Sequence, residues 1–254
     1  MNWLIGFCTA GLITLLAYRL RLLTAGGAWV AIVVGTSVFG AGGIEASLPM
    51  VGFFFTSSLL PRLLGRPHKT ERRTAAQVLA NGLAPTVCCW GAVLLPLHAK
   101  AFWLAYLASV AAATADTWAT ELGVRFGSPV WHLTTGRRIP AGQSGGVSWQ
   151  GTLAGAAGAS LIALSGQPLV GAAETLATAA ALGCGGMILD SLLGATLQAR
   201  YRCKVCAALT EQASCCDMPT QHIGGLRAID NNAVNALSTL ATATAGFLLG
   251  FLHR

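Results

Sequence analysis

The sequence predicts an all-α fold, a polytopic bundle of membrane-spanning helices. Of its 254 residues, 54% are hydrophobic and only 10% are charged, whereas soluble domains carry roughly 25% charged residues. The mean hydropathy is +0.62, and several apolar runs reach the length of about 20 residues that crosses a bilayer. This composition excludes a disordered chain, and 8 cysteines are too few for a disulfide scaffold.

The apolar runs divide into eight predicted spans within a single membrane domain, residues 1–254. In chain order the spans are Asn2–Leu20, Ala25–Gly40, Ala46–Leu64, Thr74–Leu97, Ala101–Thr120, Trp149–Leu164, Val170–Gln198 and Ile229–Leu252. The first is a retained helix rather than a signal peptide, because no basic residue precedes it and no small-x-small cleavage site follows it. The second is short and rich in glycine, so six or seven full spans with a half-helix are the alternative.

The basic residues test this span count. With eight spans, every Lys and Arg except Lys100 and Arg254 falls in loops on one side of the membrane. The positive-inside rule makes that side cytoplasmic and places both termini outside. The net charge of +7 is then explained without a nucleic-acid partner. We expect an integral protein of a prokaryotic inner (plasma) membrane, with its active-site loops on the cytoplasmic side.

Three carboxylates, Asp116, Asp190 and Asp230, lie at cytoplasmic ends of apolar spans. Carboxylates at membrane depth are costly and usually mark functional sites. A single one could simply reach water from a helix end, but three on one side favour a site. Glu121 follows Asp116 by five residues, about 140° around a helix. The two can share a Mg²⁺ ion only if the helix breaks near Gly123.

A glycine-rich loop, residues 121–148, leads directly into the sixth span. Its candidate phosphate-binding residues are Ser144, Gly145, Gly146 and Ser148. Glycine-rich turns before a helix N-terminus expose backbone N–H groups that attract anions. The alternative is a flexible connection in which Ser148 merely caps the helix.

Polar residues also recur at helical spacing inside the spans. Gly186, Asp190, Gly194 and Gln198 share one face, as do Asn231 and Asn235 in the last span and Gln77 and Asn81 in the fourth. Such amides can be interhelical hydrogen bonds alone. Their gathering near one membrane face instead predicts a polar centre, to which Lys69 and Arg73 add cationic candidates.

The cysteines divide into two groups. Cys8, Cys88, Cys89 and Cys184 lie in spans and are expected to be small packing residues. A cytoplasmic cysteine-rich loop, residues 199–228, holds the other group. These candidate ligands of a structural Zn²⁺ are Cys203, Cys206, Cys215, Cys216 and His222. A Cys-x-x-Cys pair in a reducing compartment favours zinc over a disulfide.

Five motifs resemble one known family. They are QVLANG, ATADTWATELG, GQSGGVSWQGTLAG, GGMILDSLLGATLQ and DNNAVN, within residues 77–235. In this order they are similar to the transmembrane-protein-19 / phytyl-phosphate kinase family of integral membrane proteins, formerly a domain of unknown function, whose plant member acts in vitamin E synthesis. The stretch 116–151 is more distantly similar to dolichol kinase, phytol kinase and CDP-lipid synthases.

The resemblance implies a CTP-dependent kinase that converts an isoprenyl monophosphate, phytyl or geranylgeranyl phosphate, to its diphosphate with Mg²⁺. It implies catalytic roles for Asp116, Glu121, Asp190 and Asp230, of which the first three would hold the metal. Taken with the residue analysis above, the candidates for binding nucleotide or phosphate are Lys69, Arg73, Gln77, Asn81, Ser144, Gly145, Gly146, Ser148, Gln198, Asn231 and Asn235. It does not imply zinc.

Two other functions are consistent with the sequence. A nucleotidyltransferase that joins CMP to a lipid phosphate would use the same CTP, Mg²⁺ and lipid. A lipid carrier or transporter would need no catalysis, but the polar residues gather at one face and no two-fold repeat is visible. The sequence leaves open whether the chain forms a homodimer.

Overall fold

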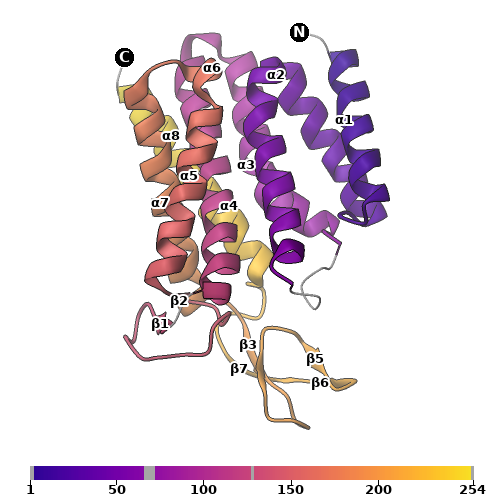
Figure 1. Cartoon of the computed structure of the whole chain (residues 1–254), viewed down its shortest axis with the longest axis vertical. Coiled ribbons are helices and arrows are strands. Elements are labelled where there is room, and N and C mark those ends of the chain that lie inside the picture. Colours follow the sequence, from indigo (N-terminus) through magenta and orange to yellow (C-terminus); the bar gives the residue numbers. More distant parts are fainter. Residues whose placement is uncertain (1–2, 66–71, 127–128, 253–254) are drawn as a thin grey trace.

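The computed structural model describes residues 3–65, 72–126 and 129–252. Within them it contains eight α-helices, which form one bundle (Figure 1). The helices are α1 (Trp3–Arg19), α2 (Ala25–Leu63), α3 (Ala75–Leu94), α4 (Ala99–Phe126), α5 (Trp149–Ser165), α6 (Gln167–Val170), α7 (Ala173–Thr196) and α8 (Asn231–Leu252), with a short 3-10 helix η2 (Pro96–His98). The predicted all-α membrane bundle is confirmed.

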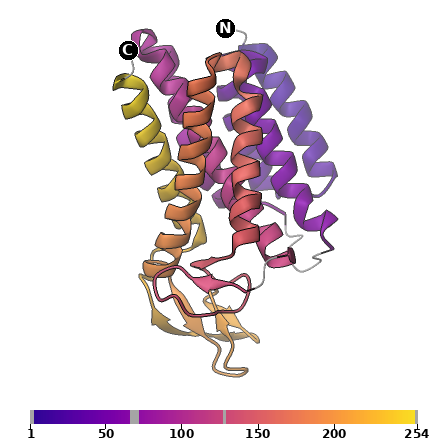
Figure 2. The same cartoon turned by 60° about the vertical axis from the view of Figure 1, so that its left-hand side comes forward.

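Short strands occur only outside the bundle in the described part of the chain. They are β1 (Trp131–His132), β2 (Gly146–Val147), β3 (Arg200–Arg202), β4 (Leu209–Thr210), β5 (Ser214–Cys215), β6 (Met218–Pro219) and β7 (Gln221–Gly224). β1 pairs with β2, β5 with β6, and β3 lies between β4 and β7, all antiparallel. These strands lie at the end of the bundle opposite both chain termini (Figures 1 and 2).

Helix α2 accounts for two predicted spans. Its backbone leaves the helical conformation at Gly43, with φ 61° and ψ −152°, a conformation that glycine adopts at low cost. The chain then turns back: the Arg62 guanidinium, near the end of α2, donates hydrogen bonds of 2.9 and 2.6 Å to the carbonyls of Leu20 and Arg21. Each arm is about 27 Å long or more at 1.5 Å per residue, so neither is a half-helix.

Three predicted boundaries differ from the structure by three residues or more. The fourth span was expected to end at Leu97, but α3 ends at Leu94. The seventh span was expected to begin at Val170, but α6 ends there, Gly171 adopts a positive φ of 74°, and α7 begins at Ala173. The fifth was expected to end at Thr120, but α4 continues to Phe126. Among the described residues, four helices, α2, α3, α7 and α8, are long and apolar enough to cross a membrane on their own, and α1 is a shorter apolar helix.

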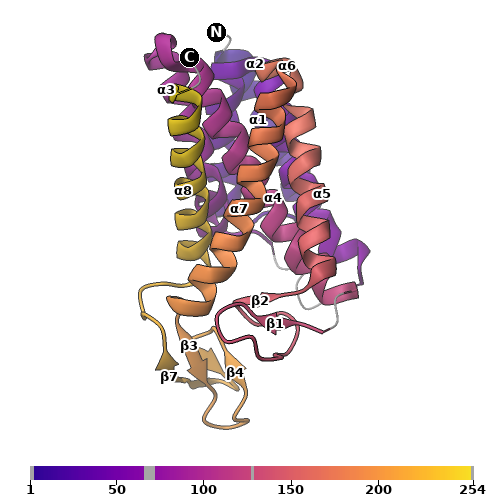
Figure 3. The ribbon, with the colours of Figure 1, turned by 90° about the vertical axis from the view of Figure 1, so that its left-hand side faces the viewer.

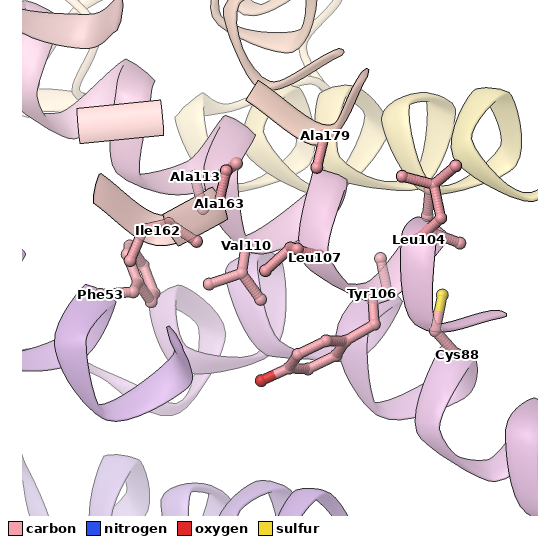
Figure 4. Packing of buried hydrophobic residues seen from close by; sticks show 14 of the residues in the cluster. Phe53, Cys88, Leu104, Tyr106, Leu107, Val110, Ala113, Ile162, Ala163 and Ala179 are labelled. Carbon is pink, nitrogen blue, oxygen red and sulfur yellow. The ribbon is translucent and has the colours of Figure 1, made fainter. Parts of the chain in front are cut away.

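Helix α4 is the centre of the bundle. All of residues 104–115 are buried, as expected for a helix that is covered on every side. Small residues let its neighbours approach closely: a Cβ atom on Gly183 of α7 would lie 2.7 Å from the Ala111 Cβ. Around it pack Phe53 of α2 and Ile162 of α5 (Figure 4). The ends of these tightly packed helices therefore hold fixed positions.

Candidate functional site

A polar cavity of about 170 Å³ lies at the end of the bundle that carries the strands. Its lining residues come mainly from the ends of α4, α5 and α7 and from the glycine-rich loop. Figure 3 shows the loop with β1 and β2 below the ends of α5 and α7. Of the predicted site residues it is lined by Asp116, Ser144, Gly145, Gly146, Ser148, Asp190, Gln198 and Asn231. Residues from four separate motifs thus meet in one place, as the helical spacing predicted.

Two carboxyl groups face each other in this cavity. Asp116 of α4 and Asp190 of α7 are hydrogen-bonded to one another, and Asp190 is only 9% exposed. The Ser238 hydroxyl donates to Asp190 Oδ2 at 2.9 Å. The Asn235 amide, with its oxygen and nitrogen exchanged, donates to the same oxygen at 3.0 Å. Because buried carboxylates need cations or donors, this pair is the best candidate for a metal site among the described membrane residues.

The glycine-rich loop crosses the end of α7 in close contact. Gly145 has a φ of 77°, and a Cβ atom there would lie 2.5 Å from the Ala195 Cβ, so only glycine fits. The next residue, Gly146, belongs to β2 and pairs with His132 of β1. This strand pair holds the loop at the cavity that Asp116 and Asp190 also line.

The N-terminus of α5 opens onto the same cavity. Ser148 is its N-cap and accepts a hydrogen bond of 3.1 Å from the Gly151 amide. The alternative interpretation of Ser148, that its side chain caps the helix, is therefore confirmed. The helix end still adds partial positive charge to the cavity wall, and Gly151 and Thr152 line the cavity.

Gln198 is a buried donor that lacks a partner. Its side chain is 2% exposed and lines the polar cavity, and its Nε2 makes no hydrogen bond within the described residues. A buried amide donor left unpaired costs about 1–3 kcal/mol. An acceptor group bound in the cavity would remove that cost.

Three sequence-based assignments need correction. Glu121 could share an ion with Asp116 only if the helix broke near Gly123. Because α4 is continuous there, the two carboxylates do not meet that condition. Glu121 is buried but is not among the residues that line the polar cavity. Asp230 is exposed and does not line it either: its Oδ1 accepts the Ala233 amide at 2.8 Å, so it caps the start of α8.

The third correction concerns Arg73, Gln77 and Asn81, which line a different cavity. This apolar cavity of about 210 Å³ lies among α1, both arms of α2, and α3. Gln77 is engaged in a capping box with Thr74. Arg73 lies over the Phe53 ring at 5.4 Å. Burial lowers the pKa of Arg73 to about 10, and the charge of Glu121 opposes that shift. Lys69 lies outside the described residues.

The structure brings the four loop cysteines together. The Sγ atoms of Cys203, Cys206, Cys215 and Cys216 all lie within 4.8 Å of one another. Backbone N–H groups of Cys206 and Val205 donate to Cys203 Sγ at 3.5 and 3.4 Å and lower the pKa of that thiol to about 6. His222 is not in the cluster; it pairs with Tyr201 across β7 and β3.

Two residues escaped the sequence analysis: Ser238, which donates to Asp190, and Glu211, which lines the cavity. Ser238 follows Asn235 by three residues, so the helical spacing that selected Asn235 could have found it. Glu211 lies in the cysteine-rich loop, and the Ser144 hydroxyl donates to its Oε1. No local pattern marks Glu211, because the fold of the loop alone brings it to the cavity.

The fold and the polar cavity define a polytopic membrane protein with a site at one end of its helix bundle. The family model described as "Integral membrane protein DUF92" matches residues 8–243. The chain belongs to this integral membrane family, which confirms the family resemblance drawn from the five motifs.

Three relatives illustrate the range of the family. The chain is similar to the uncharacterized membrane protein MJ0933 of Methanocaldococcus jannaschii, with 32% identity over 65% of this chain and 73% of the relative. It is similar to the uncharacterized membrane protein sll0875 of Synechocystis, with 32% identity over 71% and 74%. It is also similar to Protein PGR of Arabidopsis thaliana, with 28% identity over 92% and 91%. No solved structure matches the chain.

Proposed function

We propose that the protein is a CTP-dependent kinase that phosphorylates an isoprenyl monophosphate, phytyl or geranylgeranyl phosphate, to the diphosphate. The observation that carries the proposal is the pair Asp116 and Asp190 facing the Gly145–Gly146 turn in one polar cavity. The choice of CTP and of a prenyl acceptor rests on the motif resemblance.

The carboxyl pair suits Mg²⁺, which binds one or two protein carboxylates together with phosphate oxygens and water. Asp116 and Asp190 would hold the ion. When bound, Mg²⁺ would neutralise charge on the nucleotide phosphates. Without an ion, the Ser238 hydroxyl and the Asn235 amide, which both donate to Asp190 Oδ2, offset part of the cost of burying this carboxyl group.

Donors for phosphate oxygens lie on the other walls of the cavity. The unpartnered Nε2 of Gln198 and the N-terminus of α5 can both face an anion in the cavity. The Gly146 amide is not among these donors, because it donates to the Gln143 carbonyl at 3.1 Å. In the transfer, the bond between the γ-phosphorus of CTP and its bridging oxygen breaks. A bond forms from an acceptor phosphate oxygen to that phosphorus, and CDP leaves.

The acceptor phosphate is already ionised near pH 7, so this reaction needs no strong general base. Its protein groups mainly orient two phosphates and balance their charge. No histidine lines the polar cavity among the described residues, which agrees with this requirement.

The apolar cavity is our candidate site for the isoprenyl chain. Most of the side chains that line it are apolar, and Arg73 adds a cation to the lining. A Val51→Phe change would fill part of this cavity and should raise KM for the prenyl phosphate while leaving KM for CTP unchanged. Val33→Phe is the matched control, because Val33 is on the same helix but is 63% exposed. Equal effects of the two variants would exclude this lipid site.

The proposal is tested with protein purified in detergent, Mg²⁺, a panel of prenyl monophosphates, and CTP, ATP or GTP. CTP labelled at the γ-phosphate should transfer its label to the lipid, and CDP should accumulate. Label transferred from the α-phosphate with release of pyrophosphate would instead establish the nucleotidyltransferase alternative. Lipid binding without any transfer would favour a carrier.

A further inference from the structure

We propose that Cys203, Cys206, Cys215 and Cys216 bind one Zn²⁺ ion, and that this ion fixes the segment carrying Glu211 against the glycine-rich loop. The metal site does not depend on the proposed function. Only the meaning of the Glu211 contact for phosphate binding rests on it.

The spacing of the sulfur atoms fits a tetrahedral zinc ion. With Zn–S bonds of about 2.3 Å, tetrahedral geometry places sulfur atoms about 3.8 Å apart. Cys206 Sγ lies 3.9 Å from Cys215 Sγ, which lies 3.8 Å from Cys216 Sγ. These distances are much longer than the bond of about 2.05 Å in a disulfide. The four thiols are therefore arranged as ligands of a single ion.

The backbone around the cluster also fits metal binding. Amide groups of Val205 and Cys206 point at Cys203 Sγ, and such hydrogen bonds stabilise a thiolate. Ala207, Cys216 and Asp217 have positive φ values of 58°, 52° and 58°. The values at Cys216 and Asp217 are those expected for the two-residue turn that joins β5 to β6. Ala207 is in no such hairpin turn, and its conformation is costly for a residue other than glycine. A metal ion bound by the adjacent Cys206 would hold Ala207 in that conformation.

The strands of this region have little hydrophobic core to hold them. Val205, Leu209, Met218 and Ile223 are 65%, 57%, 51% and 45% exposed. A small segment that buries so little apolar surface usually needs a metal or disulfides for stability. All four cysteines of the cluster are free. With little apolar core and no disulfide among these four cysteines, a zinc ion is the element that would stabilise this segment.

The cluster is connected to the polar cavity through one residue. Glu211 lies between the Cys203–Cys206 turn and the Cys215–Cys216 turn, so both ends of its segment are anchored at the cluster. Its Oε1 accepts the Ser144 hydroxyl of the glycine-rich loop, and both residues line the cavity. Loss of the ion should therefore increase the mobility of the glycine-rich loop, although this loop lies far from the four cysteines in the sequence.

The metal is tested by elemental analysis of the full chain in detergent. We expect about one zinc per wild-type chain, and the same for Cys8→Ser, whose exposed cysteine lies in α1 outside the cluster. Cys203→Ser should lose it. If that variant does not fold, release of zinc from wild-type protein by a thiol-modifying reagent serves in its place. Folded wild-type protein without zinc after growth with added zinc, or with disulfides among these residues, would overturn the proposal.

The ligand set is tested by replacing zinc with Co²⁺, whose visible spectrum reports the number of thiolate ligands. Cys216→Ser should lose sulfur-to-cobalt intensity, and His222→Ala should not change it. The opposite result would establish three cysteines and one histidine and refute the four-thiolate site.

The connection to the glycine-rich loop is tested by hydrogen exchange, which needs no activity. Glu211→Ala should keep its zinc but raise amide exchange in residues 142–146 by roughly tenfold, the effect of losing one charge-assisted hydrogen bond. Glu211→Gln, which keeps an acceptor, should restore most of the protection. Gln212→Ala, at the adjacent exposed position, is the matched control. Unchanged exchange in Glu211→Ala and in Cys203→Ser would refute the connection but leave the metal site standing.

Discussion

Replacing either cavity aspartate by asparagine separates a catalytic role from a structural one. In Asp190→Asn, the remaining carbonyl oxygen can accept the bonds that Ser238 and Asn235 make to Oδ2. The new amide can donate to Asp116, which already hydrogen-bonds to Asp190. The polar groups therefore stay paired, and we expect the free energy of unfolding to change by less than about 1.5 kcal/mol.

The rate should respond much more strongly. An amide neutralises one ligand of the proposed Mg²⁺ site, and loss of a positioned electrostatic group raises the barrier by about 2.7 kcal/mol or more, at least roughly 100-fold in rate. Asp116→Asn should behave in the same way. The assay is CTP-dependent formation of prenyl diphosphate by purified protein, with thermal unfolding measured on the same sample.

A matched control is Glu174→Gln, which changes an exposed carboxylate in the first turn of α7, at the opposite end of the bundle from the cavity. It should keep normal activity. If both cavity variants also work within about threefold of wild type, the two aspartates are structural. If instead both variants fail to fold, the surrounding residues need the negative charge of the aspartates for stability. Our account of the hydrogen bonds that asparagine would keep is then wrong.

Three further predictions concern the rest of the chain. Arg137→Cys should resist an impermeant thiol reagent in intact cells while Lys100→Cys reacts, and labelling of the first would contradict a cytoplasmic glycine-rich loop. Gly145→Ala should lower the unfolding temperature and the activity, because its Cβ would meet Ala195 at a typical overpacking cost of about 1–3 kcal/mol. The control is Gly136→Ala, a position with positive φ but open space around it. This variant should lose about 1–2 kcal/mol of stability and keep its activity. Asp230→Ala should lose about 1 kcal/mol of stability as a helix cap while keeping most activity, and a loss of 100-fold would restore its catalytic role.

The fold was largely predictable because membrane helices are specified by length, hydropathy and the distribution of basic residues. The kink at Gly43 lies between two expected spans, because the glycine-rich stretch there separates two apolar runs. The extension of α4 to Phe126 was missed because the polar residues that follow Thr120 resemble the start of a loop.

The site was predictable where helical spacing governs it and unpredictable where tertiary packing does. Asp190 and Asn235 lie on inward faces of α7 and α8, where helical spacing identified them. The same spacing selected Gln198, which lies just beyond the end of α7 and still lines the cavity. Glu121 and Asp230 were not separated from the cavity residues because a carboxylate near a helix end has the same sequence signature whether it lines a cavity, is buried elsewhere or caps a helix. Glu211 was missed because its approach to Ser144 depends on the three-dimensional path of the cysteine-rich loop.

The central claim is that the cavity containing Asp116 and Asp190 binds a metal–nucleotide complex. The most direct measurement is electron paramagnetic resonance of Mn²⁺, used as a probe in place of Mg²⁺, titrated into purified protein with CTP. We predict one tightly bound Mn²⁺ per chain in wild type and in Glu121→Gln, and its loss in Asp116→Asn and Asp190→Asn. Unchanged Mn²⁺ binding in the two aspartate variants, or its loss in Glu121→Gln alone, would contradict the account.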